Sequence, residues 1–278
     1  MKNLLFPFSI VLTFAVSAAS GQSNSNSRGD IYKINQFKAT APVPSLSTEL
    51  IVSVDNPINK RLKSMMLEVG DPTLLKGKRF AIISTDGVEE LELIVPYKFL
   101  ADRGATVHLV SPKSPTVPDI FGVAIPEIRK DHILTVHYME NSGWIKIDKY
   151  LDEVSANDYD AFIIPGGAWN PDGIRVNTNA QKMVVDANTQ RKPIMAVCHG
   201  PLLLVNAGLI KGKQVTSFWN IQVDLQNAGA TWKDESCVVD GNIITGRYPF
   251  DLPDLMTALL KQMGISISIG ESKENASR

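Results

Sequence analysis

PIMAVCHGPLLLVNAG, residues 193–208, is the stretch that decides the fold of this chain. Its first part, residues 193–197, is a short apolar run, typical of a strand buried on both faces of a sheet. An apolar helical segment follows at residues 202–208, and Gly208 is suited to end this helix. Cys198 lies at the abrupt junction of the two segments. This order predicts a nucleophile elbow, a tight turn that exposes the side chain above a sheet.

The same alternation of strand and helix extends toward both ends of the chain. Buried strands are predicted at residues 79–85, 106–111 and 160–165, a sheet or hairpin strand at 132–139, helices at 89–103, 175–191 and 251–263, and a hairpin at 237–246. Repeated strand–helix units predict a parallel sheet that is covered on both faces. We therefore expect an α/β fold: a three-layer sandwich, flavodoxin-like, with a mostly parallel central sheet and helices on both faces.

The N-terminus has the pattern of an export signal. Lys2 precedes the apolar run Leu4–Ala19, which is shorter than the about 20 residues that a spanning helix needs. We expect a signal peptide over residues 1–21, cleaved near residues 18–21, and a secreted or periplasmic protein without stable membrane insertion. An uncleaved N-terminal anchor is the alternative. The remaining segments are expected to be an N-terminal extension or linker at 22–75, the α/β domain at 76–266 and a disordered tail at 267–278.

Composition excludes several classes of function. The 278 residues include 28 Lys and Arg against 29 Asp and Glu, a formal net charge of −1. A chain without a basic surplus is not expected to bind nucleic acid as its main ligand. Two cysteines are too few for a disulfide scaffold, and the four histidines are too scattered for a zinc site. We expect neither a metal nor another cofactor.

Three polar segments follow predicted strands directly. They are residues 85–90, residues 165–172 and residues 196–201. Ligands of open α/β sheets bind beyond the carboxyl ends of the strands. If the strands are parallel, the three segments therefore meet at one edge of the sheet and form one site.

Cys198 is the candidate nucleophile of this site. A helix that begins at His199 would direct its N–H groups at the sulfur and lower the pKa of the thiol. The alternatives are a buried structural cysteine and a disulfide with Cys237, which would consume the thiol. Cys237 lies within a predicted strand without such a context, and we interpret it as structural.

His199 and a glycine pair are the next candidates. The His199 imidazole titrates near neutrality and could act as general base or acid, unless only its backbone N–H matters. Gly166 and Gly167 would let a substrate approach the backbone, and their N–H groups could stabilise an oxyanion. A plain turn is the alternative for this pair.

Acidic residues complete the candidate set. Glu89, Glu90 and Glu92 lie at the start of a predicted helix, where carboxylates are favoured electrostatically, and one of them could approach the thiol. Asp172 follows Asn170-Pro171 and could be only a helix N-cap.

Four segments together resemble the PfpI/ThiJ family, within the class I glutamine amidotransferase-like superfamily. They are FAIISTDGVEELEL at 80–93, DAFIIPGGAWNPDGIR at 160–175, IMAVCHGPLLLVNAGLIKGKQVTS at 194–217 and DGNIITGR at 240–247. The resemblance implies that Cys198 is the nucleophile and His199 its partner. It implies that Glu89 is the buried acid that contacts the sulfur. Asp172 would complete a Cys-His-acid group, across a subunit interface in some members, so we expect a homo-oligomer, a dimer or higher.

The resemblance also limits the chemistry. The His-x-Glu pair of amidotransferases is replaced here by residues 248–251, which read YPFD, so glutamine hydrolysis is disfavoured. The first hypothesis is a glyoxalase III-type or deglycase-type enzyme that acts on methylglyoxal or its adducts. The second is a cysteine peptidase with a peptide substrate. The third is a non-enzymatic redox sensor or chaperone whose Cys198 is oxidised.

Overall fold

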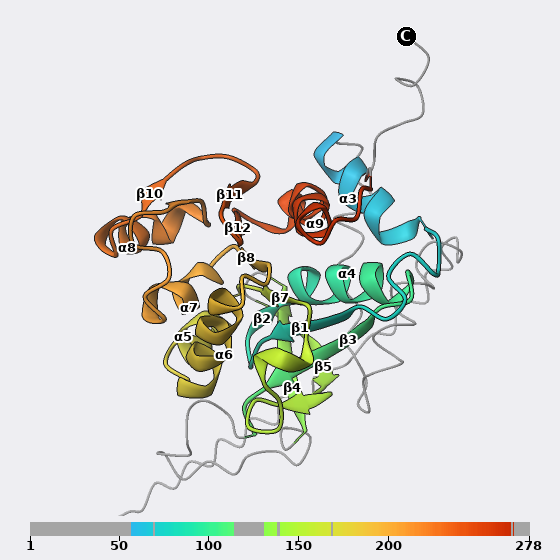
Figure 1. Cartoon of the computed structure of the whole chain (residues 1–278), viewed down its shortest axis with the longest axis horizontal. Coiled ribbons are helices and arrows are strands. Elements are labelled where there is room, and N and C mark those ends of the chain that lie inside the picture. The colour runs from blue at the N-terminus through green and yellow to red at the C-terminus, as the bar shows by residue number, and fades with distance from the viewer. Residues whose placement is uncertain are drawn as a thin grey trace, which may run out of the picture.

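The structure is a computed structural model that describes residues 57–68, 70–113, 131–137, 140–167, 169–267 and 269 (Figure 1). The side chains of residues 57–59 and 140–141 are not among those described. The expected signal peptide, most of the N-terminal extension and most of the C-terminal tail lie outside the described residues.

A seven-stranded sheet forms the centre of the molecule, in the order β11-β12-β8-β7-β1-β3-β6. The strands are β1 (Arg79–Ile83), β3 (Thr106–Ser111), β6 (Lys149–Tyr150), β7 (Ala161–Ile164), β8 (Ile194–Val197), β11 (Val238–Asp240) and β12 (Ile243–Gly246). All neighbours are parallel except β11 and β12, which form the predicted hairpin. Gly241 has φ +65° at its turn, a conformation that glycine adopts without strain.

Alternation along β1 divides the core into two layers. Phe80 and Ile82 belong to one hydrophobic cluster, and Ala81 and Ile83 to the other, because successive side chains of a strand point to opposite faces. The first cluster holds residues of α3 (Pro57–Leu67), α4 (Glu90–Ala101) and α9 (Leu252–Gln262). The second holds residues of α5 (Asn170–Arg175), α6 (Thr178–Thr189), α7 (Pro201–Asn206) and α8 (Gln222–Asn227). The two groups of helices cover opposite faces (Figure 1), so the predicted three-layer fold is confirmed.

Two smaller sheets flank the main one. β2 (Val88–Glu89), β4 (His132–His137) and β5 (Glu140–Lys146) form one, and the predicted strand at 132–139 is its middle strand. β9 (Gln214–Val215) and β10 (Thr231–Trp232) form the other.

The helix predicted at residues 175–191 is α6, and the short helix α5, which precedes it, was not predicted. They are separated because the Asn177 side chain accepts a hydrogen bond from the Ala180 N–H and caps α6 at its N-terminus.

Helix α3 connects the described part of the N-terminal extension to the main domain. Leu62, Met65 and Met66 are buried in the same cluster as α4 and α9. Arg61 also pairs with Asp254 of α9 at 2.7 Å. This part of the chain therefore packs on the α/β domain. Within the described residues, no helix combines the length and apolar character needed to cross a membrane.

Candidate active site

Cys198 lies on a strained turn between β8 and α7. Its φ is +61°, a left-handed conformation that costs a residue with a side chain on the order of 1–3 kcal/mol. The Cys198 N–H donates to the Gly246 carbonyl at 3.0 Å, and the Gly200 N–H donates to the Val197 carbonyl at 2.8 Å. A Cβ at Gly200 would lie 2.2 Å from the Ile164 carbonyl oxygen, so only glycine lets α7 begin this close to β7. These contacts form the elbow that the sequence predicts.

Polar groups surround the Cys198 sulfur. His199 Nδ1 lies 3.2 Å from Sγ, so the two neighbouring side chains face each other. The backbone N–H groups of Gly167 and His199 also hydrogen-bond the sulfur. Cys198 is 8% exposed, and neither it nor Cys237 is in a disulfide. The sulfur is thus reduced and held among hydrogen-bonding groups.

The expected lowering of the Cys198 pKa is not observed. Burial raises the pKa of this thiol well above its usual value, and the negative charge of Glu92 raises it further. The N–H groups of Gly167 and His199 oppose these effects. The prediction was wrong because it weighed the helix N-terminus and left out desolvation, which is the larger effect here. The resting sulfur is therefore a thiol.

Glu92, and not Glu89, is the acid that hydrogen-bonds the thiol, which corrects the assignment made from the family resemblance. Its Oε2 accepts the Gly166 N–H at 2.6 Å, and the side chain is fully buried. Burial and the nearby charge of Glu89 raise the Glu92 pKa to about 8. At neutral pH, Glu92 is therefore mostly protonated. Its hydrogen bond with Cys198 lowers the Glu92 pKa and raises the pKa of the thiol, so the thiol S–H is the donor and a carboxyl oxygen accepts.

His199 is suited to accept the thiol proton. Burial lowers its pKa, while the charges of Asp172 and Asp224 raise it to a smaller extent. The ring is therefore neutral near pH 7, and its Nδ1 faces the sulfur. It stacks on Phe218, with ring centroids 5.1 Å apart, which fixes its orientation. The structure places Asp172 on the exposed side of the first turn of α5, where it acts on His199 through its charge.

The backbone N–H groups of Gly166 and Gly167 have different hydrogen-bond partners. The Gly166 N–H is bonded to Glu92, whereas the Gly167 N–H points at the sulfur. Gly167 has φ +104°, and a Cβ there would lie 2.3 Å from the Glu89 nitrogen and from the Gly87 oxygen. The N–H groups of Gly167 and His199 therefore face the sulfur, whereas the Gly166 N–H holds Glu92.

Asn170 holds this turn in place, and sequence reasoning missed it. The side chain is completely buried and bonds both strand ends. Its Nδ2 donates to the carbonyls of Pro165 and Gly166 at 2.8 and 2.9 Å, and its Oδ1 accepts the Thr85 N–H at 2.8 Å. Its position shortly after the glycine pair was the available signal, because an amide side chain carries both two N–H donors and an acceptor oxygen.

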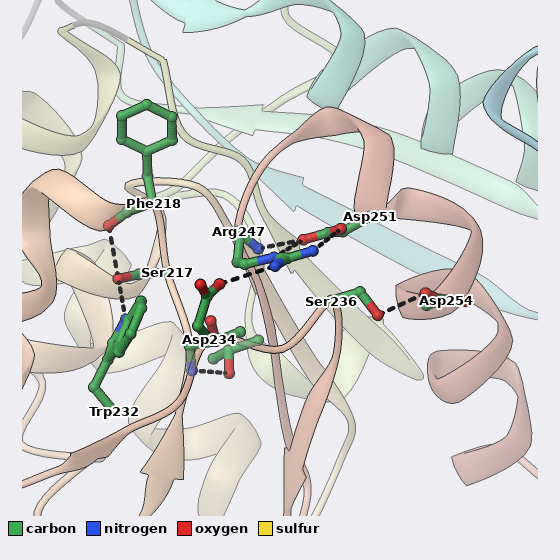
Figure 2. Close-up of polar contacts among 10 residues, drawn as sticks. Ser217, Phe218, Trp232, Asp234, Ser236, Arg247, Asp251 and Asp254 are labelled. Carbon is green, nitrogen blue, oxygen red and sulfur yellow. Dashed lines mark hydrogen bonds and ion pairs between the residues drawn. The ribbon is translucent and has the colours of Figure 1, made fainter. Parts of the chain in front are cut away.

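A cluster of charged and aromatic side chains adjoins Phe218, the ring on which His199 stacks. Figure 2 shows its charged members, Arg247, Asp234 and Asp251. Arg247 bonds Asp251 through Nε at 2.9 Å and Asp234 through Nη1 at 2.8 Å. Its guanidinium also lies over Trp219, whose ring contacts Phe218. Arg247 therefore fixes the loop that carries the ring stacked on His199. Trp219 itself is 41% exposed.

The described residues contain no group of three or more His, Cys, Asp or Glu side chains that could hold a metal ion. What the site does bring together is a buried thiol, a neutral imidazole and a protonated carboxyl beside two backbone donors. Such an arrangement can add a sulfur nucleophile to a carbonyl carbon and stabilise the resulting oxyanion.

Comparisons with known proteins show what this chain is similar to. A model of the DJ-1/PfpI family matches residues 78–262. Deglycase PfpI of Pyrococcus furiosus is 32% identical over 66% of this chain and 98% of its own length. A putative cysteine protease, YraA of Bacillus subtilis, is 35% identical over 63% of this chain and 92% of its own. Among solved structures, a two-domain protein of Anabaena variabilis with DJ-1/ThiJ/PfpI-like and ferritin-like domains is similar, with 34% identity and a TM-score of 0.56. That match covers 71% of this chain and 51% of the other.

Proposed function

The chain belongs to the DJ-1/PfpI family, and from that premise we propose that it is a deglycase-type or glyoxalase III-type enzyme acting on methylglyoxal or its adducts. The observation that carries the proposal is the 3.2 Å contact between the Cys198 sulfur and Nδ1 of a neutral His199. The deglycase names of several similar proteins support the choice of substrate class.

The proposed reaction begins with thiol addition to the aldehyde. As the sulfur attacks the carbonyl carbon, its proton passes to His199 Nδ1 and the oxygen takes the negative charge. The N–H groups of Gly167 and His199 stabilise this oxygen, and a hemithioacetal results. His199 returns the proton to this oxygen to complete the hemithioacetal. The hydrogen of the former aldehyde carbon then moves as hydride to the adjacent carbonyl carbon, and the hydroxyl proton passes to the oxygen of that carbonyl, which gives a thioester of lactate. Water then hydrolyses the thioester and restores the thiol.

The decisive experiment compares Cys198→Ala with Cys237→Ala, because these are the two cysteines of the chain. Lactate formed from methylglyoxal, and free amine released from a glycated amino acid, are measured. We expect Cys198→Ala to lose activity on the order of 10³-fold or more, as removal of a nucleophile does. Cys237→Ala should retain it, since that thiol lies outside the site. Equal turnover by both variants would exclude the mechanism.

A cysteine peptidase is the second candidate. The Gly167 N–H beside the sulfur would serve an amide carbonyl as well as an aldehyde, and one relative is named a putative cysteine protease. Cleavage of peptide substrates that depends on Cys198, in the absence of turnover of methylglyoxal and its adducts, would favour this candidate over the first.

We also propose that the protein is exported and forms a homo-oligomer. The pattern of residues 1–21 supports export, and the exposed Asp172 beside His199 supports a site that a second subunit covers. Export is tested by recovering the protein outside the cytoplasm and identifying its N-terminal peptide by mass spectrometry. The oligomeric state is tested by measuring the molecular mass of the protein in solution.

A further inference from the structure

The two exposed tryptophans of the chain both border the candidate site. Of the four tryptophans, Trp169 and Trp219 are 53% and 41% exposed, whereas Trp144 and Trp232 are half-buried. Ligand sites are lined predominantly by hydrophobic and aromatic side chains, so exposed indoles beside a reactive thiol point to contact with a substrate. The proposed reaction assigns no role to either ring.

Trp169 borders the sulfur on the side of Gly167. It directly precedes α5, and its N–H donates to the Gly87 carbonyl at 3.3 Å. A Cβ added to Gly87 would lie 2.6 Å from Trp169 Cβ and 2.9 Å from Cε3 of its ring, so the indole lies against Gly87. The Gly87 oxygen is itself packed against Gly167, whose N–H faces the sulfur. Trp169 is therefore fixed close to a group that contacts the sulfur.

Trp219 borders the site on the side of His199. It begins the short 3-10 helix Trp219–Ile221, directly after Phe218. The Phe218 N–H donates to the Cys198 carbonyl at 3.0 Å, and the Phe218 ring stacks on His199. The centroid of the Trp219 ring lies 5.4 Å from that of Phe218, in an edge-to-face contact. The two tryptophans therefore adjoin the site from two different elements.

The Trp219 ring is held in place although it is exposed. Its indole N–H donates to the Asp234 carboxylate, and the Arg247 guanidinium lies over the ring, 5.7 Å from the centroid. Arg247 pairs in turn with Asp234 and Asp251, so two carboxylates compensate this cation. A ring that is oriented before its ligand arrives loses little conformational entropy when the ligand binds.

The charges beside the two tryptophans are negative. Asp172 lies in the first turn of α5, which Trp169 precedes, and Asp224 lies in the first turn of α8, which follows the helix that Trp219 begins. Both carboxylates are exposed. Within the described part of the chain, they are the charges that act on His199.

Aromatic faces and carboxylates have one kind of ligand in common, an organic cation. A guanidinium or ammonium group is attracted by the negative face of an indole, and a carboxylate adds a charge of opposite sign. An anionic ligand gains nothing from these faces and is repelled by Asp172 and Asp224. The imidazole of His199, which is neutral near pH 7, does not offset this difference.

We propose that Trp169 and Trp219 are specificity residues that, together with Asp172 and Asp224, select carbonyl substrates that carry an organic cation over substrates that carry an anion. An adduct of methylglyoxal with an arginine side chain is a substrate of the first kind, and its adduct with N-acetylcysteine, which keeps a carboxylate, is of the second. The inference rests on the proposed function for its substrates. Its test needs no turnover, so either can fail without the other.

The test compares two thiol reagents of opposite charge. Trimethylammonioethyl and sulfonatoethyl methanethiosulfonate carry the same reactive group beside a cation or an anion. Their rates are measured in the protein with Cys237→Ala, in which Cys198 is the one remaining cysteine. The ratio of the two rates is independent of the fraction of thiolate, because both reagents react with the same sulfur. We expect this ratio to exceed that of N-acetylcysteine amide at least about five-fold.

Substitution of the rings tests their part in this ratio. Trp169→Leu is the cleaner variant, because Trp219 also contacts Phe218 and Arg247. Each of Trp169→Leu and Trp219→Leu should lower the ratio about two- to five-fold, the effect of a cation at an exposed ring. Trp169→Phe keeps an aromatic face and should restore most of the ratio. Val239→Ala on β11 removes exposed apolar atoms elsewhere and should leave it unchanged.

Substitution of the carboxylates tests the electrostatic part. Asp172→Asn combined with Asp224→Asn should lower the ratio about two-fold or more at low salt. Sodium chloride at about 0.5 M should remove most of this difference, because it screens exposed charges. A wild-type ratio equal to that of the free amide overturns the proposal, and so does a ratio that both leucine variants leave unchanged. A ring-dependent ratio in a protein that turns over neither methylglyoxal nor its adducts would contradict the proposed function alone.

Discussion

At position 92 the protein keeps a carboxyl group in an environment that disfavours its charge. Burial, the Glu89 charge and the Gly166 N–H act on the same group, and the first two prevail. The site therefore separates its functions between residues. Near neutral pH, the His199 imidazole and the Glu92 carboxyl, which both contact the sulfur, carry no charge.

This state of Glu92 predicts a pH dependence of stability. The folded pKa of about 8 lies above the ordinary value of 4.5, so between these pH values the folded chain binds more protons than the unfolded chain. The free energy of unfolding should therefore fall as pH rises through this window, by at most about 1.4 kcal/mol for each unit of pH.

Glu92→Gln, which cannot titrate, should flatten this dependence, as measured by urea unfolding at several pH values. The amide oxygen of the introduced glutamine can still accept the Gly166 N–H, so the comparison isolates the charge. The same slope in both proteins would show that Glu92 is ionised in the folded state across the window.

At the scale of elements, the elbow depends on the close contact between α7 and β7. Gly200→Ala would place a methyl group 2.2 Å from the Ile164 carbonyl oxygen, and the backbone would have to move. We expect the free energy of unfolding to fall by about 3 kcal/mol, at the upper end for overpacking. Alkylation of Cys198 by iodoacetamide should change as well, because the turn that carries the sulfur shifts.

Gly208→Ala provides the comparison at the other end of the same helix. Gly208 has φ +71°, but no atom lies within 4 Å of its added Cβ. Alanine should cost about 1 kcal/mol of backbone strain there and leave Cys198 alkylation unchanged. If the two variants alkylate alike, the close contact at Gly200 does not position the sulfur.

At the scale of the whole molecule, α3 belongs to the core of the α/β domain although it precedes the region that the family model matches. Leu62 is completely buried among α3, α4 and α9. Leu62→Ala should lower the free energy of unfolding by about 2–5 kcal/mol, in one cooperative transition followed by circular dichroism.

Lys60→Ala is the matched control on α3, because that side chain is exposed and should change stability by no more than about 0.5 kcal/mol. A separate early transition in Leu62→Ala would mean that α3 unfolds independently of the domain.

The sequence alone was sufficient for the main buried strands β1, β3, β7 and β8 and for the position of the elbow. Buried strands such as residues 161–164 and 194–197 are apolar runs, and the sharp junction at Cys198 is visible in neighbouring residues. These features are local, because the backbone period and the need to bury apolar side chains act within a few residues. Because these strands are parallel, the three polar segments that follow them were expected to meet at one edge of the sheet.

Only the tertiary structure determined which groups surround the sulfur and in which protonation state. The choice of Glu92 over Glu89 depends on how α4 is rotated against β8, and the partner of Glu89 comes from β4, far along the chain. The raised pKa of the thiol depends on the amount of protein that excludes water from it. Rotation and desolvation are set by contacts between distant segments, which no local pattern records.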